Sequence, residues 1–221
     1  MTTEATGFLY PFIEADERDA DHLVAELATS AQAKLGDSVA LRAATVAQWR
    51  TSLEAAGAEI AGRFRRGGRL FAFGNGGSAT DAEGAVALFV DPPHGRALPA
   101  RSLVDDPAIL TALGNDVGFD LVFSRQLIAH ARDGDIVVGF STSGGSVDVL
   151  RAFDEAKRHD ILTVGLCGYE GGAMAASGSI DHCLVVRSDS VHRIQESHSA
   201  LLLDLWMVVQ RVLDEQEVTR D

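Results

Sequence analysis

The sequence predicts an α/β fold built on a five-stranded parallel sheet with helices on both faces. From residue 69 onward, short runs of Val, Ile, Leu and Phe alternate with helical segments, which is the pattern of a buried parallel sheet. Two loops rich in glycine and serine each follow an apolar run and precede a helical segment, as strand-to-helix loops do. The pattern predicts an α/β domain over residues 41–221 and a helical extension over residues 1–40.

The amino-terminal part predicts two helices. In residues 16–35 the apolar side chains recur at helical spacing. Gly36 indicates the end of this helix, and Ser38 indicates the start of a second one that runs to about Phe64. The apolar positions from Val46 to Phe64 recur close to the helical period, so this second helix has one face for packing.

The remaining elements follow from the alternation of apolar runs and helical segments. Strands are expected at residues 69–74, 98–104, 136–140, 162–167 and 182–187. Helices are expected at residues 78–90, 106–113, 118–131, 146–158, 170–177 and 191–215.

Composition limits the class of protein. The chain has 221 residues and a formal net charge of −13, which argues against binding nucleic acid or anionic membranes through a basic surface. Cys167 and Cys183 lie in apolar runs and are expected to be buried free thiols, which indicates a cytoplasmic protein. The sequence shows no signal peptide and no apolar segment long enough to span a bilayer.

The two glycine-rich loops predict a site for a phosphorylated ligand. The first is residues 74–78, Gly-Asn-Gly-Gly-Ser, and the second is residues 141–146, Ser-Thr-Ser-Gly-Gly-Ser. Such loops offer backbone N–H groups and hydroxyl donors where a helix begins, so they hold a phosphate without Lys or Arg. Because both loops follow strands of one sheet, we expect the ligand at the carboxyl edge of that sheet. Ser146 is also expected to cap the following helix through its side chain.

Two other interpretations of the first loop stay open. Residues 74–79 also fit the G-x-G-x-x-A form of a dinucleotide-binding fingerprint, and Asp105 closes the next strand. An ordinary structural turn would also explain the glycines. The second loop argues against a dinucleotide site and against a structural turn, because a capped turn does not need four hydroxyls and two glycines. No Gly-Lys-Ser/Thr follows it, which excludes a P-loop for nucleoside triphosphates.

Six motifs occur in the order and spacing of one family. They are Gly-Asn-Gly-Gly-Ser at 74–78, Gly-Asn-Asp-x-Gly-Phe at 114–119, Ser-Arg-Gln at 124–126, Gly-Asp at 134–135, Ser-Thr-Ser-Gly-x-Ser at 141–146 and Arg-Ile-Gln-Glu-x-His at 193–198. Over residues 40–215 the chain resembles the sugar isomerase (SIS) domain family, and within it the phosphoheptose isomerases and a related replication regulator that associates with an initiator protein. The resemblance implies a flavodoxin-like, three-layer α/β/α sandwich and a homotetramer with ligand pockets between subunits.

The resemblance also implies roles for individual residues. The phosphate of the sugar would be held by four hydroxyl-bearing residues, Ser141, Thr142, Ser143 and Ser146. Five further residues would face or adjoin the sugar, namely Asn75, Gly76, Ser78, Asp116 and Gln195. A carboxylate beside a sugar is chemically reasonable, because it accepts strong hydrogen bonds from hydroxyls.

The chain departs from the family at its catalytic and metal-binding positions. In the resembled isomerases the helix after the first loop carries a His and then a Glu, and the last helix carries a Gln and then a His. These groups supply the acid–base pair and a zinc site. Here Gly84 and Leu88 stand at the first two positions, Gln195 is kept, and Leu203 stands at the last. Most zinc ligands are therefore absent, no metal is expected at the family site, and the usual catalytic mechanism lacks its base.

Three other side chains are candidates for the missing catalytic groups: Glu83, His192 and Glu196. His192 and Glu196 lie four residues apart on one helical face, where they could serve as a base and its partner or as two metal ligands. The alternative is a structural pair at the start of a helix. Asp81 is expected in the first turn of its helix, and His198 is expected to have a structural role.

Two functions are consistent with these observations. The first is aldose–ketose isomerisation of sedoheptulose 7-phosphate by a relocated acid–base pair. The second is a non-catalytic regulatory or protein-interaction module that responds to a sugar phosphate and has a protein partner. Neither involves direct binding to nucleic acid or to a membrane. The second is favoured if the wall facing the sugar holds Gly84, Leu88 and Leu203 but none of the three candidates.

Overall fold

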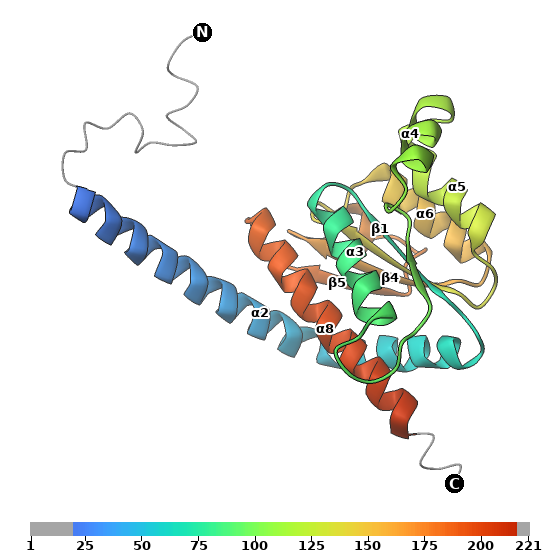
Figure 1. The fold of residues 1–221 in the computed structure, drawn as a ribbon, viewed down its shortest axis with the longest axis horizontal. Coiled ribbons are helices and arrows are strands. Elements are labelled where there is room, and N and C mark those ends of the chain that lie inside the picture. Colours follow the sequence, from blue (N-terminus) through green and yellow to red (C-terminus); the bar gives the residue numbers. More distant parts are fainter. Residues whose placement is uncertain (1–19, 216–221) are drawn as a thin grey trace. The chain divides into compact units, whose positions relative to one another are not determined.

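A computed structural model describes residues 20–215 of the chain (Figure 1). Five parallel strands form one sheet in the order β2-β1-β3-β4-β5. The strands are β1 (Leu70–Gly74), β2 (Ala100–Ser102), β3 (Ile136–Ser141), β4 (Leu162–Gly168) and β5 (His182–Val186). Each lies within its predicted range or extends it by one residue, so the predicted five-stranded parallel sheet is confirmed.

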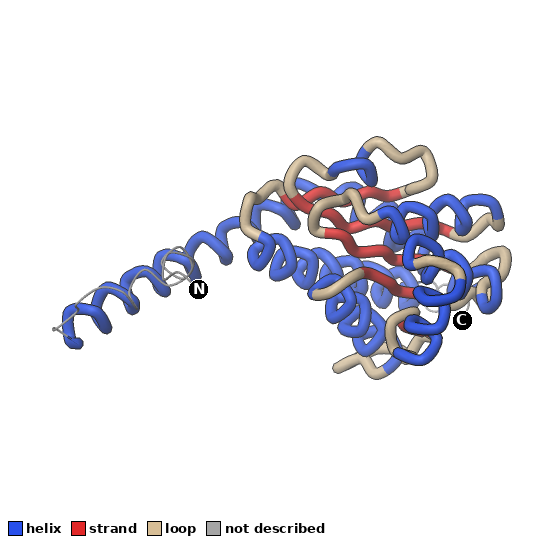
Figure 2. Tube along the Cα trace, turned by 90° about the horizontal axis from the view of Figure 1, so that it is seen from above, coloured by secondary structure: helices blue, strands red, loops and turns tan. Residues whose placement is uncertain are grey.

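Helices cover both faces of the sheet, which confirms the α/β/α layering (Figure 2). They are α2 (Ala20–Arg65), α3 (Gly77–Val90), α4 (Pro107–Asp116), α5 (Val122–His130), α6 (Val147–Arg158), α7 (Gly172–Ala175) and α8 (Val191–Glu215), with a 3₁₀ turn η2 (Phe119–Leu121) before α5. None of these helices is long and apolar enough to cross a membrane.

The chain forms two compact units, residues 1–40 and residues 41–221. In the first unit the structure describes residues 20–40, which are the amino-terminal part of α2. The second unit contains the rest of α2, the sheet and the other helices.

The predicted helix break at Gly36 was wrong. The helix α2 runs from Ala20 to Arg65 without interruption. Gly36 does not adopt the left-handed conformation with which a glycine ends a helix. A glycine inside a helix costs only about 1 kcal/mol relative to alanine, so the residue type alone does not stop the helix.

The predicted helix over residues 118–131 begins later than expected. Gly118 has a φ of 122°, a conformation outside the helical range. The 3₁₀ turn η2 follows it, and α5 starts only at Val122. Because Gly118 is not helical, α5 begins one turn later than predicted.

One face of the sheet packs against α3, α8 and residues 41–65 of α2. The core there includes Leu53 and Ile60 of α2, Phe89 of α3, and Leu205 and Trp206 of α8, all fully buried. Burying one such side chain contributes about 1.5–3 kcal/mol.

The other face packs against α5 and α6. The ring of Phe73 in β1 lies 5.3 Å from the Phe123 ring of α5 and 5.4 Å from the Phe153 ring of α6, measured between centroids. Gly139 of β3 makes room for them, because a Cβ there would lie 2.5 Å from Phe153. Large aromatic side chains thus fix α5 and α6 over the strands that carry the two loops.

The two cysteines are free thiols, as predicted. Their Sγ atoms lie 3.7 Å apart, with Cys167 buried in β4 and Cys183 half-buried in β5. The contact with Cys183 and burial both raise the pKa of Cys167, so this thiol stays protonated.

Candidate phosphosugar site

The two glycine-rich loops lie side by side at the carboxyl edge of the sheet. β1 and β3 are neighbours, with Leu70 opposite Ile136 and Gly74 opposite Phe140. The loop of residues 74–78 follows β1, and the loop of residues 141–146 follows β3. The predicted juxtaposition of the two loops is therefore confirmed by the strand order.

The first loop turns sharply into α3 and lies against α8. Gly76 has φ 57° and ψ −123°, a backbone conformation that favours glycine. Gly77 begins α3, and a Cβ there would lie 2.1 Å from Nε2 of Gln195. Gln195, from the far end of the sequence, thus lies against the first loop at Gly77. Its role beside the sugar stays a prediction.

The second loop gathers its hydroxyls. Ser141 Oγ lies 2.9 Å from Ser146 Oγ and 3.5 Å from Ser143 Oγ. Ser143 Oγ in turn accepts a hydrogen bond from Gly145 N at 3.2 Å. The carbonyl of Thr142 accepts a hydrogen bond from Gly168 N at 3.0 Å, which ties the loop to the end of β4. Three serine hydroxyls therefore converge at the start of α6, where the helix dipole favours an anion.

The predicted side-chain cap by Ser146 was wrong in its mechanism. Ser146 does occupy the position before α6, with extended backbone, but its side chain makes no capping hydrogen bond. Its hydroxyl pairs with that of Ser141 instead. The Ser146 hydroxyl thereby stays grouped with the other hydroxyls of the second loop.

A polar pair of a half-buried Asn75 and a buried Asp148 connects the first loop to the helix that follows the second. The Asn75 side-chain amide donates to both carboxylate oxygens of Asp148, at 3.0 Å and 2.8 Å. Asp148 lies in the first turn of α6 and is buried. The carboxylate is charged and its partner is neutral, so these are among the stronger hydrogen bonds of the molecule. They fix the position of Asn75 relative to the loop of residues 141–146, called the hydroxyl loop below.

Asp116 occupies a different element. It ends α4 and is exposed, and its Oδ1 accepts a hydrogen bond from Asn115 Nδ2 at 2.6 Å. Its role beside the sugar stays a prediction.

A cavity of about 290 Å³ lies between α3 and α8, next to the two loops. Its lining is Thr80, Asp81, Gly84 and Leu88 from α3, Phe140 from β3, and Ser199, Leu202 and Leu203 from α8. Phe140 directly precedes the hydroxyl loop, and Thr80 Oγ1 donates to the Gly77 carbonyl at 2.6 Å. All three positions at which the resemblance to the isomerases is lost therefore line one cavity beside the loop of residues 141–146.

Asp81, which lines this cavity, forms a buried titratable pair with His198 that the sequence did not reveal. Asp81 Oδ2 lies 3.7 Å from His198 Nδ1, and the two side chains are 10% and 0% exposed. Within residues 20–215 neither of these atoms has a hydrogen-bond partner. The expected first-turn position of Asp81 was wrong, because α3 begins at Gly77 and none of its first-turn residues is acidic. One feature of the sequence could have placed Asp81 at the cavity: it lies three residues before Gly84 and therefore shares a helical face with it.

The three alternative catalytic candidates lie elsewhere. Glu83 is exposed on α3, and His192 and Glu196 are exposed on the first turns of α8. None of the three is among the residues that line the cavity. Their catalytic role stays a prediction that the arrangement of the cavity does not favour.

The donor set around the cavity does not fit a zinc ion. Gly84, Leu88 and Leu203 carry no atom that binds zinc, and zinc prefers Cys, His and carboxylate ligands. In the described part of the chain, no three His, Cys, Asp or Glu side chains are grouped so that they could hold a metal.

Comparison with known proteins agrees with this geometry. A model of the SIS domain matches residues 35–168. A phosphoheptose isomerase of Geobacter sp. (strain M21) is 43% identical over 164 residues, which are 73% of this chain and 84% of the relative. One of Roseiflexus sp. (strain RS-1) is 44% identical over 157 residues, 69% of this chain and 78% of the relative.

Solved structures give the same result. The phosphoheptose isomerase GmhA of Neisseria gonorrhoeae superposes with a TM-score of 0.76 at 33% identity, over 84% of this chain and 99% of that one. The phosphoheptose isomerase of Francisella tularensis superposes with a TM-score of 0.76 at 27% identity, over 83% and 97%. The chain therefore belongs to the SIS domain family and is a protein of the phosphoheptose isomerase type.

Proposed function

We propose that this protein binds a small phosphorylated ketose, with sedoheptulose 7-phosphate as the first candidate, and does not isomerise it. The observation that carries the proposal is the contrast between the two sides of the site. The hydroxyl loop of residues 141–146 is complete, whereas the cavity beside it presents Gly84, Leu88 and Leu203.

Isomerisation between an aldose and a ketose needs a base that moves a proton between two adjacent carbons. It also needs an acid or a metal at the oxygens. Gly84, Leu88 and Leu203 supply none of these groups. Phosphate binding depends on other atoms, namely hydroxyls and the backbone at the start of α6. The groups that bind phosphate are therefore distinct from the groups that catalyse isomerisation, so the protein can lose turnover and still bind the sugar. A protein that binds a sugar phosphate without converting it suits a role as a sensor or regulator.

We further propose that the protein is a cytoplasmic homotetramer with its ligand sites between subunits. Exposed apolar side chains beside the cavity support a contact between subunits. Leu203 and Met207 lie one turn apart on α8 and are 45% and 43% exposed. Two large apolar side chains exposed on one helical face are typical of a surface that another protein covers. A protein partner that responds to sugar binding belongs to the same proposal.

Titration calorimetry with sedoheptulose 7-phosphate tests the binding part. Ser143 is exposed in the hydroxyl loop, so Ser143→Ala removes a hydroxyl with little effect on the fold. We expect about tenfold weaker binding, since hydrogen bonds to charged groups are worth about 1.5–3 kcal/mol. Thr111→Ala, an exposed hydroxyl on α4, is the matched control and should bind like the wild type. Equal affinity of Ser143→Ala and wild type would contradict the assignment of the loop.

A second candidate function is isomerisation with Asp81 as the base, favoured by the buried Asp81–His198 pair at the cavity. Asp81 Oδ2 has no hydrogen-bond partner within residues 20–215, and Asp81 is one of the residues that line the cavity. This function requires turnover that Asp81→Asn abolishes while sugar binding persists. Turnover that survives in Asp81→Asn would exclude it.

A further inference from the structure

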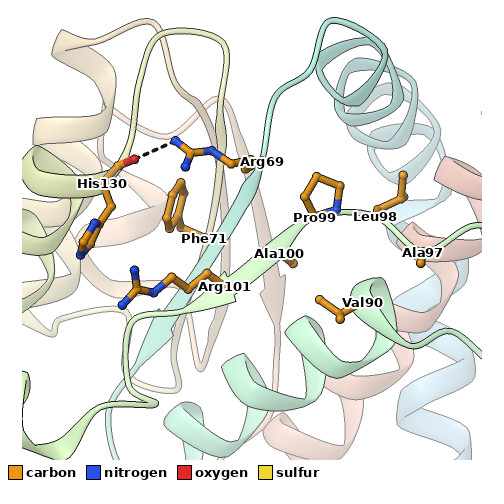
Figure 3. A pocket seen from close by; sticks show the side chains of 9 residues that line it. All are labelled: Arg69, Phe71, Val90, Ala97, Leu98, Pro99, Ala100, Arg101 and His130. Atoms are coloured by element: carbon orange, nitrogen blue, oxygen red, sulfur yellow. Dashed lines mark hydrogen bonds between the residues drawn. The ribbon is translucent and has the colours of Figure 1, made fainter.

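A pocket of about 500 Å³ lies beside the edge strand β2, away from the two loops. Its lining is Arg69, Phe71, Val90, Ala97, Leu98, Pro99, Ala100, Arg101 and His130 (Figure 3). Arg69 directly precedes β1, residues 97–99 lead into β2, and His130 ends α5 before β3. These positions belong to the amino edge of the parallel sheet, so the pocket is separate from the candidate phosphosugar site at the carboxyl edge.

The pocket has room for a small molecule but not for an added strand. Ser102 of β2 is only 4% exposed, and the Leu98 N–H already donates to the Phe89 carbonyl at 2.7 Å. The outer side of β2 is thus closed on both sides of Ala100. A volume of about 500 Å³ falls within the range of about 300–1,000 Å³ that is usual for small-molecule sites. The side chains of the pocket, rather than the backbone of β2, would therefore hold an occupant.

The two halves of the pocket differ in chemistry. Figure 3 shows Arg69, Phe71, Arg101 and His130 grouped on one side, and Val90 with residues 97–99 on the other. One half is therefore cationic, and the other is apolar.

Hydrogen bonds of the protein hold both halves in place. In the apolar half, the bond from Leu98 N to the Phe89 carbonyl ties the segment before β2 to the end of α3. In the cationic half, Arg69 Nη2 donates to the His130 carbonyl at 2.7 Å and ties the start of β1 to the end of α5. The pocket is therefore formed by the fold itself, as most small-molecule sites are.

The positive charge of the cationic half is only partly compensated. The buried carboxylate of Asp135 accepts from Arg69 Nη2 at 2.9 Å, and its other oxygen lies 3.9 Å from Arg132 Nε. One carboxylate thus serves two guanidinium groups. Arg101 is half-buried and forms no ion pair with any described residue. In a chain with a net charge of −13, this half of the pocket is a local site for an anionic group.

Arg69 also keeps N–H groups that the described residues do not use. Its side-chain hydrogen bonds to His130 and Asp135 both start from Nη2, and its buried Nε has no hydrogen-bond partner within residues 20–215. The guanidinium lies 5.3 Å from the centroid of the Phe71 ring, a contact that favours one position of the cation. The planar guanidinium matches the two oxygens of a carboxylate, so Arg69 and Arg101 together suit a carboxylate ligand.

We propose that this pocket binds a small organic acid that carries one carboxylate on a short apolar body. The carboxylate lies between Arg69 and Arg101. The apolar body passes Ala100, whose side chain is small, and covers Val90 and Leu98. Val90 is apolar and 46% exposed, so covering it removes apolar surface from water. A bare anion would leave the apolar half uncovered, and a neutral apolar ligand would leave the guanidinium groups without an acceptor.

Saturation-transfer NMR with 4-phenylbutyrate and the full chain tests the proposal. We expect saturable binding of this acid. The matching amide, 4-phenylbutyramide, keeps the apolar body and loses the charge, so it should bind about tenfold more weakly. Acetate keeps the carboxylate and lacks the ring, and it should also bind at least about tenfold more weakly.

Variants of the two halves should change binding in different ways. Arg101→Gln should weaken 4-phenylbutyrate about tenfold and reduce the difference between the acid and the amide. Val90→Ser should weaken the acid and the amide by the same factor, because it removes only an apolar contact. Arg50→Gln is the matched control: Arg50 is exposed and adjoins Trp49, whose indole donates to the Val185 carbonyl of β5 at the opposite end of the sheet. It should leave binding unchanged.

Three results would each overturn the proposal: no saturable binding of 4-phenylbutyrate, equal affinities for the acid and the amide, or wild-type affinity in Arg101→Gln. The comparison of acid and amide uses the wild-type protein, so it holds even where urea unfolding shows that a variant has lost its fold. Sedoheptulose 7-phosphate should not displace 4-phenylbutyrate. Displacement would place the acid at the phosphosugar site and would also overturn the proposal.

Discussion

The side-chain amide of Asn75 donates hydrogen bonds to both carboxylate oxygens of Asp148, at 3.0 Å and 2.8 Å. Asn75 follows β1, and Asp148 lies in the α6 helix that follows β3. The pair therefore fixes the loop of residues 74–78 relative to the start of α6. Since Asp148 is buried, we propose that it acts on the ligand through Asn75, as a positioning residue.

Asp148→Asn should weaken sedoheptulose 7-phosphate binding about tenfold, because the amide keeps only one acceptor and loses the charge. Calorimetry gives the affinity, and urea unfolding shows whether the fold is kept. Asp154→Asn is the control on the same helix, since Asp154 bonds to Ser179 and not to either loop. An Asp148→Asn protein that binds with wild-type affinity would exclude the positioning role.

Gly77→Ala should also weaken sugar binding about tenfold or more. The added Cβ would lie 2.1 Å from Gln195 Nε2 and must displace that side chain. Gly178→Ala is the matched control: Gly178 is exposed between α7 and β5, outside both loops and the cavity, and a Cβ there meets nothing within 4 Å. It should leave sugar binding unchanged. Similar affinities in the two variants would show that Gln195 does not contribute to the site.

Asp181 should make the stability of the protein depend on acid pH. Burial raises its pKa, but hydrogen bonds from Lys157 and Thr163 outweigh burial and hold the pKa below its ordinary value of 3.8. A carboxyl whose pKa is lowered by folding stabilises the protein above the unfolded-state pKa and loses that effect as the pH falls through the folded-state value.

Asp181→Asn should therefore lower the free energy of unfolding at pH 7 by about 1–3 kcal/mol, measured with urea. The difference from wild type should shrink below about pH 4. The control is Asp160→Asn. The Asp160 side chain is 77% exposed, so its ion pair with Arg63 should contribute less than about 1 kcal/mol to the free energy of unfolding. A difference for Asp181→Asn that is constant from pH 7 to pH 3 would contradict this account.

The strands and the two loops could be predicted from sequence because their signals are local. Apolar runs give the strands, and the glycine and serine content gives the loops. α8 was predicted at 191–215 and spans Val191–Glu215. The break at Gly36 was predicted wrongly, because a glycine ends a helix only in a left-handed conformation that the sequence does not specify.

The parts of the site that could not be predicted depend on contacts between distant residues. Asp81 and His198 meet only because α3 and α8 pack together on one face of the sheet. A serine at position 146 fits the sequence pattern of a helix cap whichever partner its hydroxyl has. Only the folded loop shows that this hydroxyl pairs with Ser141 and not with the backbone of α6. The loss of the family groups at Gly84, Leu88 and Leu203 was evident from sequence, but their grouping around one cavity was not.

The most direct test of the central claim is isomerase turnover of sedoheptulose 7-phosphate, with and without added zinc, at a protein concentration where calorimetry shows the site to be saturated. The account predicts a bound sugar and no turnover above the protein-free control under either condition. Turnover by the wild-type protein would contradict it, and would show that another group at the cavity has replaced the acid–base pair.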